Sequence, residues 1–261
     1  MNFKLGNVPN RARKPRQRGL TMVMDKGLST RQAEDFIEAS GELTDLVKLG
    51  FGTSYVTKKL KTKIKLYQEA DMKVYLGGTL FEAFLVRNKV DEYKKLLNDL
   101  GLTTVEISDG SITIPHGKKC KLIRDFAKDF TVLSEVGSKE AGIFISPAKW
   151  INMMSKEIAA GSWKVIAEAR ESGTVGIYRP NGTAHTVLIN KILAKVKKDD
   201  ILWEAPQKAQ QVYFIKLLGA NVNLGNIAPH ELIPLECLRL GLRGDTFFQF
   251  LKDGKDTVIN L

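Results

Sequence analysis

An acidic and a basic residue bracket a glycine near the middle of the chain, in the stretch Ser134-Glu135-Val136-Gly137-Ser138-Lys139. The apolar residues before it predict a buried β-strand, and Glu135 falls inside that run, where an unpaired charge would be costly. Lys139 follows in the loop that such a strand opens into. An acid and a base meeting at a strand end is typical of barrel active sites. For a single pair, a buried ion pair of purely structural use is the alternative.

Charged side chains recur at the ends of other predicted strands. A ring of carboxylates needs a cation, and oxygen ligands favour Mg²⁺ over zinc. From strand-end position we predict Glu106, Glu135 and Glu168 as the metal ligands. Basic residues between the carboxylates would hold an anionic substrate. The charged members of this predicted mouth are Asp25, Lys26, Lys48, Glu106, Glu135, Lys139, Glu168, Arg170 and Glu204.

Glycines and small polar residues complete the predicted mouth. Gly77-Gly78-Thr79 and Gly225-Asn226 can present backbone N–H groups with little side-chain obstruction. The loops after strands seven and eight are the usual phosphate cradle of a barrel. Tight turns are the alternative reading of each glycine pair. The predicted substrate- and phosphate-binding residues are Gly77, Gly78, Thr79, Ser108, Asn223, Gly225 and Asn226.

The elements that must position these residues repeat along the chain. Predicted strands begin near residues 20, 46, 73, 104, 131, 164, 201 and 221, and each is followed by a predicted helix. Eight such units predict a single (β/α)8 TIM barrel over residues 19–261, preceded by a short basic N-terminal arm over residues 1–18. A doubly wound open sheet is the alternative, but the Gly-rich first turn of the dinucleotide type is absent from the sequence.

Composition limits the class of protein. The 261 residues carry a formal net charge of +11, concentrated in the arm and in a lysine cluster at 58–65. Because no aromatic interleaving accompanies these clusters, we expect a solvated basic face and no nucleic-acid partner. The two cysteines match no metal spacing, and no apolar run reaches the length of a membrane span. We therefore expect a cytoplasmic protein with no membrane partner, whose histidines occupy surface or cap positions.

At its strand ends the sequence resembles the phosphosulfolactate synthase family. The match follows the chain in order after the arm, although Phe51 stands where a Trp is common. The matching stretches are Gly19-Leu20-Thr21, Asp25-Lys26-Gly27-Leu28, Gly52-Thr53-Ser54, Gly77-Gly78-Thr79-Leu80-Phe81-Glu82, Glu106-Ile107-Ser108-Asp109-Gly110, Glu135-Val136-Gly137, Arg170-Glu171-Ser172-Gly173, Glu204-Ala205-Pro206, Asn221-Val222-Asn223-Leu224 and Gly241-Leu242-Arg243 with Asp245-Thr246.

The resemblance implies a carbon–sulfur lyase that adds sulfite to phosphoenolpyruvate with Mg²⁺ and gives (2R)-2-phospho-3-sulfolactate, a precursor in coenzyme M synthesis. It implies that Lys139 is the general acid, that Lys48 and Arg170 neutralise substrate anions, and that Gly225-Asn226 hold phosphate. A homo-oligomer is expected. The alternative is a non-catalytic, stress-associated relative of the same barrel family, and the intact Asp25-Lys26 favours the enzyme.

Overall fold

The computed structural model describes residues 2–137 and 145–251. The strands are β1 Thr21–Asp25, β2 Leu46–Leu49, β3 Lys73–Leu76, β4 Thr104–Ile107, β5 Thr131–Val136, β6 Ser162–Ala167, β7 Ile201–Glu204 and β8 Leu224–Ile227. The α-helices are α1 Thr30–Ser40, α2 Thr53–Val56, α3 Leu60–Glu69, α4 Gly78–Leu85, α5 Val90–Asp99, α6 His116–Phe126, α7 Pro147–Ala159, α8 Thr186–Leu193, α9 Lys208–Leu218 and α10 Leu232–Arg239. Short 3-10 turns are η1 Gly41–Leu43, η2 Lys198–Asp200 and η3 Pro229–Glu231.

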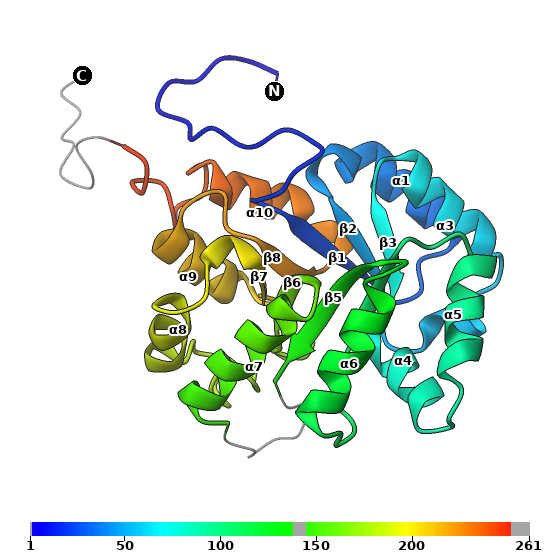
Figure 1. Cartoon of the computed structure of the whole chain (residues 1–261). Helices are drawn as coiled ribbons and strands as arrows, with labels where there is room; N and C mark the ends of the chain where they lie inside the picture. Colours follow the sequence, from blue (N-terminus) through cyan, green and yellow to red (C-terminus); the bar gives the residue numbers. More distant parts are fainter. Residues whose placement is uncertain (1, 138–144, 252–261) are drawn as a thin grey trace, which may run out of the picture.

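The eight strands found in these ranges are parallel and form one sheet in the order β3-β2-β1-β8-β7-β6-β5-β4. The two edge strands, β3 and β4, lie near each other, so the sheet curls into a nearly closed barrel with the helices around it (Figure 1). The predicted (β/α)8 fold is confirmed. In the same described ranges, the search for a helix long and apolar enough to cross a bilayer found none.

Strand alternation divides the core into two parts. The outward positions, such as Val23, Val47 and Val105, pack under the helices. The inward positions form a smaller apolar layer of Leu20, Met22, Leu46, Tyr75, Leu133, Ile166 and Leu202. Because side chains repeat on one face every second residue, the next inward position on several strands is a charged mouth residue. Lys48, Glu135, Glu168 and Glu204 each stand two residues after a member of the inner layer.

Side chains close the seam between β3 and β4. The Gly78 N–H donates to Glu106 Oε1 at 2.7 Å. Glu82 on α4 accepts a hydrogen bond from the Ser108 hydroxyl and from the N–H groups of Gly110 and Ser111. A Cβ on Gly78 would collide with Ser108 and Glu106. The close approach of these two loops therefore requires glycine at this position.

The predicted start of the eighth strand, near residue 221, was wrong by about three residues, since β8 begins at Leu224. Residues 220–223 connect α9 to β8, and the carbonyls of Ala220 and Val222 accept hydrogen bonds from the buried Arg239. The true strand reads Leu-Gly-Asn-Ile, whose central residues have low β propensity. Its Gly225 is needed inside the barrel, where a Cβ would lie 2.8 Å from Met22 Cε.

Two further expectations were incomplete, one about the helices and one about the lysine cluster. The short helices α2 and α4 follow β2 and β3 directly and were not predicted. Pro234 lies in the first turn of α10, where a proline is tolerated, and the short turn η3 precedes this helix. In the lysine cluster at 58–65, Lys63 is not on a solvated face: it is buried and pairs with Asp25 Oδ2 at 2.8 Å.

The N-terminal arm is attached to the amino-terminal end of the barrel from about residue 10 onward and runs past β1 and α10 (Figure 1). Arg11 Nε lies 2.8 Å from Glu236 Oε1 and Arg16 Nη1 lies 3.0 Å from Asp45 Oδ1. Lys14 donates to the carbonyls of Gly41 and Ala70. Three of the arm's basic side chains, Arg11, Lys14 and Arg16, are thus engaged by the barrel itself.

Removing residues 1–10 is expected to shift the melting temperature by less than about 3 °C, because the ion pairs of the arm begin at Arg11. Removing residues 1–18 is expected to lower it by about 4 °C or more, since the partners Glu236 and Asp45 would lose their cations. Thermal denaturation of both truncations checks this. An equal loss for the two would show that residues 1–10 are also docked.

Candidate active site

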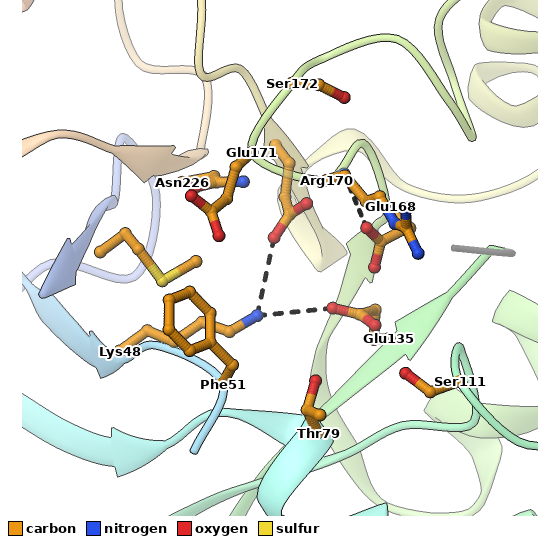
Figure 2. A pocket seen from close by; sticks show the side chains of 12 residues that line it. Lys48, Phe51, Thr79, Ser111, Glu135, Glu168, Arg170, Glu171, Ser172 and Asn226 are labelled. Carbon is orange, nitrogen blue, oxygen red and sulfur yellow. Dashed lines mark hydrogen bonds and ion pairs between the residues drawn. The ribbon is translucent and has the colours of Figure 1, made fainter. Parts of the chain in front are cut away.

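A cavity of about 420 Å³ opens at the carboxyl ends of the strands, as expected for this fold. Its lining is Met24, Lys48, Phe51, Thr79, Ser111, Glu135, Glu168, Arg170, Glu171, Ser172, Glu204 and Asn226. Figure 2 shows the charged members converging from β2, β5 and the loop after β6. Among the described residues, the lining carries four carboxylates and two basic side chains.

Lys48 lies at the centre of the carboxylates. Its Nζ is 3.0 Å from Glu106 Oε2, 3.4 Å from Glu135 Oε2 and 3.7 Å from Glu204 Oε1, and the residue is only 5% exposed (Figure 2). Burial alone would lower the pKa of Lys48, but the carboxylates of Glu106, Glu135 and Glu204 outweigh it and raise this pKa well above its ordinary value. Lys48 is therefore a permanent positive charge at the floor of the cavity.

The predicted metal ligands separate into two groups. Glu135 and Glu168 line the cavity from β5 and from the residue after β6. Glu106 is fully buried below them, where one oxygen accepts the Gly78 N–H and the other faces Lys48. In residues 2–137 and 145–251, no three His, Cys, Asp or Glu side chains form a metal-binding group. The three-glutamate set is thus not assembled, because the Lys48 ammonium lies between Glu106 and Glu135.

A site with two carboxylates remains compatible with this geometry. Mg²⁺ commonly takes one or two protein carboxylates and completes its shell with water and substrate oxygens. Glu135 and Glu168 present such oxygens to the cavity, whereas Glu106 does not reach it. The residues present therefore fit Mg²⁺ held by Glu135 and Glu168.

The loop after β6 forms the basic side of the mouth. Arg170 lines the cavity with a left-handed backbone (φ 55°), and its N–H donates to Glu168 Oε1 at 2.6 Å. Lys26 lies at the rim, where it pairs with Glu171 Oε2 at 2.5 Å, and both side chains are nearly half exposed. Because Glu171 lines the cavity, this pair joins the loops after β1 and β6 across the opening.

Asp25 supports the mouth from beneath. It is buried, is not part of the cavity lining, and accepts the N–H groups of Gly27 and Leu28. The Tyr67 hydroxyl and Lys63 Nζ contact its other oxygen at 3.0 Å and 2.8 Å. Asp25 therefore fixes the turn that carries Lys26 and lies beneath the cavity lining.

The predicted phosphate residues fall at several different places. Thr79 and Asn226 line the cavity. Gly78 and Ser108 close the β3–β4 seam. Gly77 packs against the end of β2 and the loop after it, where a Cβ on Gly77 would lie 2.7 Å from the Phe51 nitrogen. Gly225 faces the inner apolar layer. Asn223 was misplaced by the wrong strand boundary: it lies at the amino-terminal end of the barrel and donates to the carbonyls of Asp199 and Ile201.

Lys139, predicted as the general acid, lies outside the described residues, so its position is not part of this geometry. Several lining residues were not predicted as site residues, namely Met24, Phe51, Ser111, Glu171 and Ser172. Two signals could have found some of them. Glu171-Ser172 directly follows Arg170 in a stretch that resembles the family, and Ser111 ends the loop after β4. Glu82, in the stretch after Gly77-Gly78, could have been noticed in the same way.

Comparisons with known proteins identify the family of this chain. The model of the (2R)-phospho-3-sulfolactate synthase (ComA) family matches residues 9–245. The chain is 43% identical to a phosphosulfolactate synthase of Methanothermobacter thermautotrophicus, over 92% of this chain and 95% of that protein. It is 40% identical to the phosphosulfolactate synthase of Bacillus subtilis, over 92% and 97%. Protein HEAT-STRESS-ASSOCIATED 32 of Arabidopsis thaliana is 20% identical over 88% of each chain.

Among solved structures, 3-hexulose-6-phosphate synthase from Salmonella typhimurium matches with a TM-score of 0.56 and 15% identity, covering 86% of this chain and all of that chain. At that identity the likeness supports the barrel fold alone. The family match and the identity to the synthases extend over nearly the whole barrel, including the strand ends that form the cavity. This chain belongs to the (2R)-phospho-3-sulfolactate synthase (ComA) family.

Proposed function

We propose that this protein is a lyase that adds sulfite to phosphoenolpyruvate to give (2R)-2-phospho-3-sulfolactate. The observation that carries the proposal is the family match together with a cavity whose floor is the buried, permanently charged Lys48. The non-catalytic alternative is not favoured, since identity to the synthases is twice that to the stress-associated relative.

The proposed reaction adds sulfite and one proton across the C2–C3 double bond of phosphoenolpyruvate. The sulfur lone pair of sulfite forms a bond to C3 of the enol, and the C2–C3 π electrons move toward the substrate carboxylate. A proton then adds to C2, so oxidation and reduction balance within the molecule. Lys48 is suited to stabilise the charge that builds on the carboxylate, because it is fixed and shielded from water. Its raised pKa makes it a poor proton donor.

The remaining basic groups are assigned by role. We propose that Arg170, in the loop after β6, binds the phosphate together with Asn226, which lies near the end of β8. We propose Lys139 as the general acid, by resemblance to the family. In the sequence, Lys139 comes two residues after Gly137, which follows β5. Lys26, held by Glu171 at the rim, is placed to attract both anionic substrates toward the opening.

Mg²⁺ would be held by Glu135 and Glu168, and when bound it supplies positive charge beside the substrate carboxylate. This proposal is supported by the position of the Glu135 and Glu168 carboxylates in the cavity lining. The homo-oligomer and the cytoplasmic location also stay predictions, of which the first is checked by the mass of the protein in solution.

Glu135→Gln is expected to weaken Mg²⁺ activation at least tenfold and to leave the fold intact, because the amide keeps the shape but loses the charge. Activity of the unaltered enzyme should vanish in excess EDTA and return with Mg²⁺. The measurement is the rate as a function of free Mg²⁺ for both proteins. Identical titration curves would remove Glu135 from the ligand set, and full turnover in EDTA would remove the metal from the proposal.

The proposed function is tested by following phosphoenolpyruvate consumption in the presence of Mg²⁺, with and without sulfite. Consumption that requires sulfite supports it. Absence of consumption at any sulfite concentration would contradict it, and consumption without sulfite would point to another reaction of the same substrate.

A further inference from the structure

A buried ammonium group lies directly behind the cavity wall. Lys119 on α6 is fully buried. Its Nζ lies 2.5 Å from the carbonyl oxygen of Glu135, 2.8 Å from Asp109 Oδ1 and 3.0 Å from Glu157 Oε1. An ammonium has three N–H donors, so these three acceptors use its full hydrogen-bonding capacity.

The three acceptors belong to three separate parts of the barrel. Asp109 is in the loop after β4, Glu135 is near the end of β5, and Glu157 is on α7. Glu157 also contacts His116 Nε2 at 3.1 Å, which ties the start of α6 to the same cluster. Lys119 is therefore the point where the loop after β4, strand β5 and helix α7 are joined.

The β-ladder explains why β5 needs such a partner. The pairing of β4 with β5 ends at Ile107 and Ser134, whereas the pairing of β5 with β6 continues to Val136. Glu135 is thus the first residue of β5 beyond the β4 ladder. Lys119 donates to its carbonyl oxygen and so provides a hydrogen bond where the neighbouring strand has stopped.

Lys119 keeps its charge in this setting. Burial alone would lower the pKa of Lys119, but the carboxylates of Glu157 and Asp109 outweigh it and raise this pKa. The neighbouring imidazole of His116 faces Glu157 rather than Lys119. The geometry of three tetrahedral donors is therefore maintained, and the planar fork of an arginine could not reproduce it.

We propose that Lys119 is a positioning residue: it holds the end of β5 so that the Glu135 carboxylate stays against Lys48 and in the cavity wall. Lys119 contacts none of the side chains that we propose bind the substrate, and it acts only through the backbone carbonyl of Glu135. The kinetic part of this inference rests on the proposed function, whereas the structural part does not.

The test compares two variants with a matched control. Lys119→Met removes the ammonium, and Lys119→Met/Glu157→Gln also removes one of the two carboxylates that it would leave unpaired, so that folding is preserved. Arg239→Met is the control, because Arg239 is an equally buried cation that binds backbone carbonyls at the opposite end of the barrel. For each protein, amide hydrogen exchange and steady-state kinetics are measured at temperatures where it is fully folded.

In both Lys119 variants, exchange of the amides from Ser134 to Gly137 is expected to rise at least tenfold, and kcat to fall about 10²-fold with a smaller change in KM. In Arg239→Met, exchange there and kcat should match the unaltered protein. Unchanged β5 exchange, or faster exchange with a normal kcat, would overturn the inference. If the unaltered protein shows no turnover, the proposed function fails, and hydrogen exchange alone still decides whether Lys119 holds β5.

Discussion

Replacing Lys48 with methionine is expected to lower kcat/KM by about 10²–10³-fold, the largest loss for any described residue of the cavity. Methionine keeps the length of the side chain but leaves Glu106, Glu135 and Glu204 facing one another without the ammonium between them. Removing one partner of a buried ion pair also costs about 3–5 kcal/mol of stability. Kinetics and thermal denaturation of the same preparation separate the two effects.

The pH dependence of stability provides an independent check on Lys48. Because its pKa is raised in the folded protein, its contribution is fully present below the ordinary lysine pKa and is lost only as the pH rises through the higher folded value. The difference in unfolding free energy between the unaltered protein and Lys48→Met should therefore not decline between about pH 6 and 9. A difference that declines within this interval would contradict the assignment. Lys65→Met, at an exposed lysine, is the control for a simple loss of charge and should leave kcat/KM unchanged.

Lys139→Ala is expected to lower kcat by about 10²–10⁴-fold, the usual contribution of a general acid, while phosphoenolpyruvate binding changes little. The reason is that proton delivery to C2 is needed only after the carbon–sulfur bond forms. Binding is measured by calorimetry with Mg²⁺ present. Lys149→Ala, at an exposed lysine of α7, is the matched control and should leave both quantities unchanged.

A different result for Lys139 would reassign the acid. If the variant keeps a near-normal kcat and loses only affinity, Lys139 is a binding residue. Lys26 would then be the better candidate, because it lies exposed at the rim and can deliver a proton from solvent. Lys48 would remain the weaker one, since three carboxylates hold its proton.

The strands were predictable where their sequences alternate or are continuously apolar. β2, β3 and β4 begin and end where expected, because each has β-branched or aromatic residues between clear turn signals. The eighth strand was misplaced because Asn221-Val222-Asn223 contains the β-branched Val222, whereas Leu-Gly-Asn, the first three residues of β8, contains no β-branched residue. The requirement for glycine at position 225 comes from Met22 and Leu202, which are distant in sequence.

The candidate site was predictable in its charges but not in its layers. The strand-end glutamates and Lys48 do converge, because inward positions of parallel strands meet at one end of the barrel. Which of these side chains reach the cavity depends on how deep they lie in the barrel. Glu106 is buried below Lys48 for a reason that the spacing of residues along the sequence does not reveal. β3 and β4 do not pair, and one Glu106 oxygen accepts the N–H of Gly78 between them. The supporting roles of Asp25, Glu82 and Lys119 likewise arise from contacts between elements.

The most direct test of the central proposal is to incubate the purified protein with phosphoenolpyruvate, sulfite and Mg²⁺ in D₂O and to identify the product by mass spectrometry and NMR. The account predicts phosphosulfolactate with a sulfonate on C3, one deuterium on C2 and a single configuration at that carbon. Recovery of unchanged phosphoenolpyruvate, or a product without the C3–sulfur bond, would contradict it.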